Sequence, residues 1–183
     1  QLNGFIDYFE DQDRLSRVFL SGVGIVCGFE LSINAAKTII TITQGAGVTT
    51  DGDLFKLKKT SNQPPKKSID LTQVQYKYFK LFEDSFAGYS FFKKEVTMGE
   101  KKKTVPINLW EIVTEEDENT SLLNVLPNLD EKVVLLYLES FAKEGDLCTS
   151  IDCDNQGIEQ VARLRVLLVS KADAAYIAGL DSV

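Results

Sequence analysis

Histidine is absent from the 183-residue sequence. It is the commonest general base near neutral pH, the usual pH switch and a frequent zinc ligand. Without an imidazole, the serine and cysteine side chains lack the partner that most often activates them as nucleophiles. The acidic run at 115–118 is typical of a solvated loop, since a tuned carboxylate pair requires burial or a cleft. The sequence therefore predicts a protein that is not an enzyme.

Cysteine is scarce as well, with three residues, too few for a disulfide framework in a chain of this size. Cys148 and Cys153 lie close together among aspartates, and their role stays open. They could close a local disulfide in an oxidising compartment, hold a metal, or remain free thiols, which is the default. Structural zinc needs four nitrogen or sulfur ligands, and only Cys27 is left to join the pair. The sequence accordingly predicts neither a metal nor a cofactor.

Long apolar runs are missing too. The longest, 133–138, has the length of a strand, far short of the roughly 20 residues that span a membrane. The formal net charge is −7, and an acidic surface repels nucleic acid. The one basic cluster, at 101–103, follows Glu100 and precedes an acidic stretch. We therefore expect protein partners in a large assembly, with no nucleic acid and no membrane span.

The N-terminal third of the chain predicts a helix followed by strands. Residues 2–20 place apolar side chains at helical spacing, with acidic residues before basic ones, which is typical of an amphipathic helix. An alternating pattern and a β-branched run then predict an antiparallel β meander. Its expected strands are 29–33, 38–43 and 53–58.

Strands outnumber helices and no strand–helix alternation occurs, so the predicted fold class is α+β, with further strands toward the C-terminus. We expect a helix-plus-meander unit at 1–59, a linker at 60–70 around Pro64-Pro65, and a second α+β portion at 71–183. Because the chain starts without methionine and ends in an expected helix, we expect this portion to continue in a longer polypeptide. Segment 71–82 fits helix or strand, and 84–128 shows no clear period. Strands are expected at 131–140 and 160–170 and a helix at 172–180.

Spaced glycines follow the first predicted helix, in the segment Gly22-Val23-Gly24-Ile25-Val26-Cys27-Gly28. A dinucleotide site needs such glycines after a strand and before a helix, so that the phosphates meet helical N–H groups. Here the order is reversed. Gly22, Gly24, Cys27 and Gly28 are therefore interpreted as a structural corner that joins helix to strand.

A second group of glycines and aspartates lies at 45–53 and resembles a calcium loop only superficially. A calcium loop needs several alternating oxygen ligands and a late bidentate glutamate, and this segment offers only two aspartates. Gly45, Gly47, Asp51 and Gly52 are therefore interpreted as turn residues. The Asp51-Gly52 pair in particular predicts a two-residue type I′ hairpin turn.

These residues together resemble a baseplate protein of phage-tail-like contractile injection systems of the antifeeding-prophage type. The family pattern is an aromatic helix with a basic end, a His-Gly-x-Gly-Val-Val-Cys-Gly-Leu corner and a Gly-x-Ala-x-Asp-x-x-Gly turn. Here Tyr8-Phe9 and Arg14 precede the glycine-cysteine corner, Ser21 replaces the histidine and Phe29 the last leucine. The resemblance resumes at 136–139, at the two-cysteine loop and at 164–166, and it skips roughly 60–130.

The resemblance implies a structural subunit that acts by protein–protein assembly. At a structural position, the replacement of the family's histidine by Ser21 is tolerated more readily than it would be in a catalytic site. It also implies assembly in the cytoplasm as part of a virus-like particle, which is later released or docked on a membrane. The alternative is a carbohydrate- or peptide-binding module of a surface or secreted protein. Its platform would use exposed aromatic rings, although such rings more often fill a core. The candidates are Tyr76, Tyr78, Phe79, Tyr89, Phe91, Phe92 and Trp110.

Overall fold

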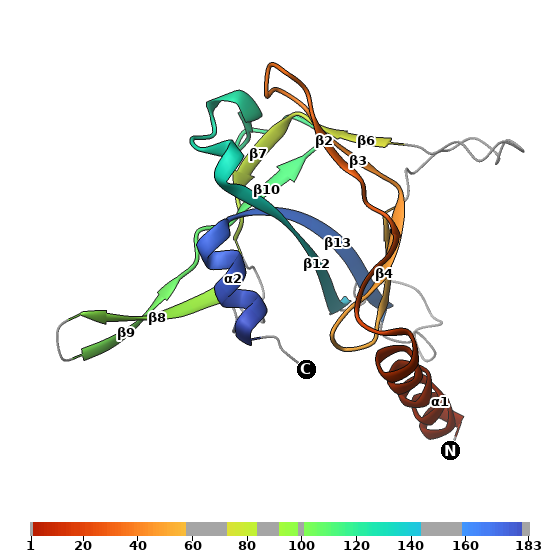
Figure 1. Ribbon diagram of the computed structural model, residues 1–183. Coiled ribbons are helices and arrows are strands. Elements are labelled where there is room, and N and C mark those ends of the chain that lie inside the picture. The colour runs from red at the N-terminus through yellow and green to blue at the C-terminus, as the bar shows by residue number, and fades with distance from the viewer. Residues whose placement is uncertain (1, 58–72, 84–91, 99–100, 144–158, 181–183) are drawn as a thin grey trace, which may run out of the picture.

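The computed structural model describes residues 2–57, 73–83, 92–98, 101–143 and 159–180. An α-helix lies near each end of the described chain, and antiparallel strands fill the space between (Figure 1). The helical segments are α1 (Leu2–Ser16), the π-helical turn η1 (Arg17–Ser21), the 3-10 turns η3 (Leu123–Val125) and η4 (Leu129–Glu131), and α2 (Lys171–Leu180). The strands are β1 (Gly24–Gly28), β2 (Leu31–Ile33), β3 (Ile40–Thr43), β4 (Gly45–Val48), β5 (Leu54–Leu57), β6 (Gln73–Tyr76), β7 (Tyr78–Leu81), β8 (Lys93–Met98), β9 (Lys101–Pro106), β10 (Trp110–Val113), β11 (Ser121–Leu122), β12 (Lys132–Lys143) and β13 (Glu159–Ser170).

Strands β1 to β6 form a bent antiparallel meander in which each row consists of two short strands in succession. β1 pairs with β4, and β4 pairs in turn with β5. In the same way, β2 pairs with β3, and β3 pairs with β6. At the bend, the Phe29 N–H donates to the Gln44 carbonyl at 3.3 Å and the Thr43 N–H donates to the Glu30 carbonyl at 3.0 Å. The linker predicted at 60–70 lies outside the described residues, and the strands on either side of it both belong to this meander.

The main sheet has five strands in the order β11-β7-β10-β13-β12. β12 and β13 pair along their whole length, from Lys132 opposite Ser170 to Lys143 opposite Glu159. β10 pairs with β13 only at Trp110 and Glu111, while it pairs with β7 along all four of its residues. The sheet therefore splits between β10 and β13 beyond Glu111.

Both faces of β13 are buried along residues 166–169, where successive strand residues point to opposite sides of the sheet. Val166 and Leu168 belong to one core cluster, which the sheet shares with the meander. Leu167 and Val169 belong to a second cluster on the other face, together with Ile177 of α2. A strand covered on both faces requires a nearly continuous apolar run, and the sequence of β13 supplies it.

The ribbon formed by β8 and β9 extends away from the main sheet (Figure 1). Lys94 Nζ lies 2.5 Å from Asp173 Oδ1 and so ties the ribbon to the start of α2. Ser170 Oγ accepts a hydrogen bond from the Asp173 N–H at 3.1 Å and donates to its carboxylate at 2.8 Å, which caps α2. Burial disfavours the charged carboxylate, but the hydrogen bonds from Lys94 and Ser170 outweigh it and lower the pKa of Asp173.

The predicted α+β class is confirmed. Segment 71–82 forms strands β6 and β7, and the unpatterned region 84–128 contributes β8 to β11. The sequence did not predict the ribbon strands β8 and β9, because lysine and threonine dominate them and polar residues do not alternate with apolar ones. The amphipathic character of α1 and the division into three regions stay predictions. Among the helices of the described residues, none combines the length and apolarity needed to cross a membrane.

Candidate protein interface

The predicted corner residues lie where η1 gives way to β1. The Gly22 N–H donates to the Arg17 carbonyl at 3.0 Å, and Gly22 leaves the helix with a φ of 83°. Gly24 begins β1, and Cys27, an exposed free thiol, pairs with Ala46 of β4. The chain therefore changes from helix to strand within two residues.

Gly28 is the position where the corner depends most strictly on glycine. Its φ is 69°, and a Cβ built there would lie 1.9 Å from the Gln44 carbonyl oxygen. The next residue, Phe29, also has a positive φ of 58°, which is uncommon for a residue with a side chain. This kink turns the Phe29 ring inward, where it is buried and packs 5.6 Å from the Phe55 ring, while β1 itself stays outside.

The interpretation of Gly45 and Gly47 as turn residues is wrong, because both lie within β4, next to β1, whereas Asp51 and Gly52 lie at the tip that follows it. Gly45 pairs with Gly28, and Gly47 pairs with Ile25. At the tip, the Gly52 N–H donates to the Thr49 carbonyl at 2.9 Å. A type I′ turn needs positive φ at both central residues, but in this tip only Gly52 has it, at 83°.

The two-residue type I′ prediction is therefore wrong. The Thr49 N–H donates to the Asp53 carbonyl at 2.9 Å, so three residues form the tip and a left-handed glycine ends it. The tip is also held against α1. Arg17 Nη1 donates to the Gly52 carbonyl at 3.1 Å, and a Cβ on Gly52 would lie 2.7 Å from the Arg14 carbonyl oxygen.

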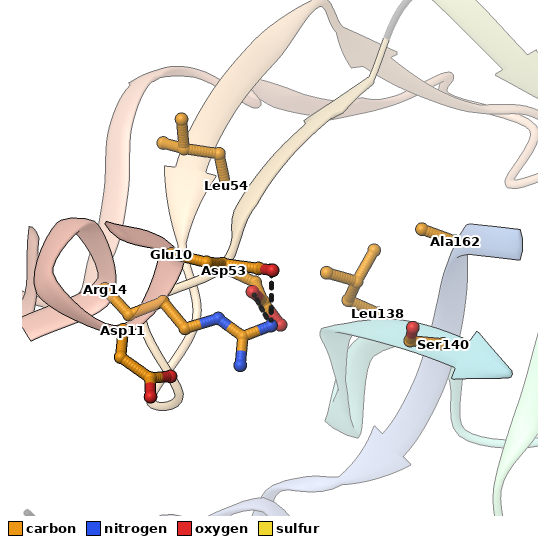
Figure 2. A pocket seen from close by; sticks show the side chains of 8 residues that line it. All are labelled: Glu10, Asp11, Arg14, Asp53, Leu54, Leu138, Ser140 and Ala162. Carbon is orange, nitrogen blue, oxygen red and sulfur yellow. Dashed lines mark hydrogen bonds and ion pairs between the residues drawn. The ribbon is translucent and has the colours of Figure 1, made fainter. Parts of the chain in front are cut away.

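A pocket of about 590 Å³ lies between α1, β5 and the β12–β13 hairpin (Figure 2). Figure 2 shows Arg14 directed at Asp53 and Glu10, with Nη2 at 2.9 Å and 3.2 Å from their carboxylate oxygens. These contacts neutralise the one cation of the lining. The contact between Arg14 and Asp53 thus ties α1 to the residue that precedes β5. Its lining is Glu10, Asp11, Arg14, Asp53, Leu54, Leu138, Ser140 and Ala162.

The outer row of the meander, together with η1 and the residue before β1, carries a run of exposed apolar side chains, which we call the apolar edge. Every residue of β1 and β2 is exposed, and within the described chain no strand pairs with the outer side of either. No charged residue occurs from Val18 to Phe29. The members of the apolar edge are Phe19, Leu20, Val23, Ile25, Val26, Leu31 and Ile33, with exposed fractions of 43% to 85%.

Natural proteins protect free edge strands with lysine, proline or inward-pointing charge, because an open strand invites pairing with another chain. The β8–β9 ribbon carries five lysines and follows that rule. The apolar edge carries neither lysine nor proline, and its protective features are the exposed Glu30 between β1 and β2 and the register shift between Ile25 and Cys27. An uncovered edge with this many exposed apolar side chains is a candidate contact surface.

No known protein family model matches this sequence, and no curated protein matches it. The surface must therefore be interpreted from its own chemistry. Sequence reasoning identified the glycines of the corner, but it did not identify the exposure of β1. The signal that was available is the long uncharged stretch in a chain that is 26% charged overall.

A buried charge cluster was also missed. Arg165 on β13 forms a two-pronged contact with Glu111, at 3.0 Å and 2.6 Å, and contacts Glu139 at 3.3 Å. The hydrogen bond to Glu111 raises the pKa of Arg165 further above its ordinary range. These residues bridge the sheet where the ladder between β10 and β13 stops. The available signal was an arginine directly before the apolar run 166–169 of the same strand.

The remaining candidates are placed as follows. Tyr76 and Phe92 are buried in the two cores, and burial raises the pKa of Tyr76 to about 12. Phe79 and Trp110 pack against the first core, and Tyr78 on β7 is half-buried, so these five rings form no exposed platform. Tyr89, Phe91, Cys148 and Cys153 lie outside the described residues.

Proposed function

We propose that this chain is a structural module that works by protein–protein assembly, with its apolar edge covered by another subunit. The observation that carries the proposal is the concentration of seven exposed apolar side chains along one edge that no strand of the described chain covers. Full burial of a large aliphatic or aromatic side chain is worth about 1.5–3 kcal/mol, so covering even part of this edge would stabilise a complex substantially.

The particle to which such a module belongs is proposed from the sequence resemblance. A baseplate-type subunit of a contractile injection system needs rigid connections between neighbours, and the corner supplies one. Arg14 and Arg17 fix α1 to the hairpin tip, and Gly28 fixes the hairpin to the outer strand. The helix and the apolar edge thus form one rigid docking unit.

The test compares two valine-to-lysine variants with nearly equal exposure in the free chain. Val26 is 65% exposed and belongs to the apolar edge, whereas Val125 is 63% exposed and lies in η3 on another part of the fold. Tagged protein is produced in its native cells, particles are sedimented and inspected by electron microscopy, and the tag is quantified in the sedimented fraction.

We expect wild type and Val125→Lys to sediment with long sheathed particles, and Val26→Lys to fall at least about tenfold, because a buried unpaired charge costs several kcal/mol. Both variants should unfold at the temperature of the wild type, since neither side chain is in the core. Equal sedimentation of the two variants, or a wild-type chain found only as a lone monomer, would contradict the proposal.

A further inference from the structure

Two projections from the fold carry opposite charge. The helix α1 and the β8–β9 ribbon extend from different parts of the molecule, at the lower right and lower left of Figure 1. The exposed acidic residues of α1 are Glu10, Asp11 and Asp13. The ribbon presents the exposed lysines Lys93, Lys101, Lys102 and Lys103.

Part of the acidic charge on α1 is already paired, and part is not. Glu10 contacts Arg14 at 3.2 Å, and Asp13 approaches Arg17 at 3.6 Å. Asp11 has no cationic partner within the described chain, and Figure 2 shows its carboxylate directed away from the ion pair that Arg14 makes. Asp11 is therefore available to a cation from outside.

The face that contains Asp11 is also apolar. Tyr8, Asp11 and Leu15 follow one another at spacings of three and four residues, so they line one side of the helix. Tyr8 is 58% exposed and Leu15 is 49% exposed. This side of α1 thus presents a carboxylate between two large apolar side chains.

One face of the ribbon has the complementary arrangement. In the ladder, Val96 lies opposite Lys103, Lys94 opposite Val105, and Met98 opposite Lys101. Residues that oppose each other in a ladder share a face, so the two half-buried valines lie beside Lys101 and Lys103. Neither of these two lysines has an acidic partner among the residues that the structure describes.

The dimensions of the two projections agree. The 15 residues of α1 correspond to about 22 Å, from the rise of an α-helix. The six residues of each ribbon strand correspond to about 20 Å. A helix laid along the ribbon would therefore match it from end to end.

We propose that the Tyr8–Asp11–Leu15 face of α1 in one copy of this chain binds the Val96–Lys103 face of the β8–β9 ribbon in the next copy. The contact joins two different surfaces, so each copy uses both, and repetition produces a ring or a row. A patch this small belongs to the class of weak contacts. Association therefore requires high local concentration and weakens as salt screens the charges.

A second copy is favoured over nucleic acid as the occupant of the ribbon. The chain carries a formal net charge of −7, which opposes approach of a polyanion to the molecule as a whole. Lysine also supplies no base-specific fork, and the ribbon contains no arginine. Lys94 on this face is already paired with Asp173, so the acidic helix would provide a carboxylate for Lys101 and Lys103 and apolar side chains for the two half-buried valines.

The experiment is sedimentation velocity across a concentration series, at about 0.02 M and about 0.5 M salt. The ribbon variant is Lys101→Glu with Lys103→Glu, and the helix variant is Asp11→Lys, because Asp11 is the acidic residue of the proposed face. The control carries Lys56→Glu with Lys77→Glu, two exposed lysines away from the ribbon that give the same change in net charge as the ribbon variant.

We expect wild type and control to self-associate at low salt, and each reversed variant to weaken at least about tenfold through like-charge contacts. Mixing the two reversed variants should restore association, because each then offers the other an opposite charge. Val26→Lys changes neither of the two surfaces and should associate like the wild type. The proposal about the apolar edge and the proposal about this contact can therefore fail independently.

Three results would overturn the proposal. One is a wild-type chain that stays monomeric at every concentration, and another is a mixture that associates no better than its components. The third is ribbon-dependent binding of a double-stranded DNA oligonucleotide by a chain that does not self-associate. Thermal unfolding of each variant confirms that the comparison is made between folded proteins.

Discussion

Removing the arginine from the buried charge cluster should destabilise this protein severely. Arg165, Glu111 and Glu139 are 11%, 5% and 6% exposed at their side chains, so two carboxylates share one guanidinium in the interior. Breaking a buried ion pair by deleting one partner costs about 3–5 kcal/mol, because the remaining charge is left uncompensated. In Arg165→Met two charges are left, and the contact of the guanidinium with the Phe82 ring at 4.7 Å is lost as well.

The readout is urea denaturation followed by fluorescence. Trp110 is the only tryptophan and lies next to Glu111 on β10, so its emission reports on the sheet around the cluster. For a denaturant slope of about 2 kcal/mol per molar urea, a loss of about 4 kcal/mol lowers the unfolding midpoint by about 2 M. That loss is a large part of a typical total stability of about 5–15 kcal/mol.

A companion variant separates charge from packing. When Arg165→Met is combined with Glu111→Leu and Glu139→Leu, no buried charge remains, and stability should return to within about 1–2 kcal/mol of the wild type. A single variant that loses less than about 1 kcal/mol would refute the reasoning. A triple variant as unstable as the single one would refute it equally, since the defect would then be one of packing.

Three further substitutions test the corner and both ends of α2. Gly28→Val should prevent folding or assembly, because a Cβ at this position would lie 1.9 Å from the Gln44 carbonyl oxygen. Gly179→Ala has open space around the new Cβ and should stabilise the protein by up to about 1 kcal/mol. Circular dichroism and thermal melts compare the two variants. The pKa of Asp173 is lowered by folding, so its contribution is present at neutral pH and is lost as the pH falls below about 4. Asp173→Asn should therefore lower the free energy of unfolding at pH 7, and the difference from the wild type should shrink as the pH falls. A difference in unfolding free energy that stays constant across that pH range would contradict the role given to Lys94.

Local patterns in the sequence were sufficient to predict those helices and strands whose partners lie close by in the sequence or whose composition is extreme. The apolar runs predicted strands that correspond to β12 and β13, and the tail predicted the helix α2. The α+β class followed from the same patterns. These features depend on side-chain periodicity, which each segment carries by itself.

The tertiary structure alone decided which surfaces are buried and which charges meet. β1 is as apolar as a core strand, yet the positive φ angles of Gly28 and Phe29 direct it outward and bury only the aromatic ring. Glu111 and Arg165 are 54 residues apart in sequence and meet because β10 and β13 pair at a single short ladder. Contacts of this range depend on the geometry of the whole sheet, so no local pattern of residues can encode them.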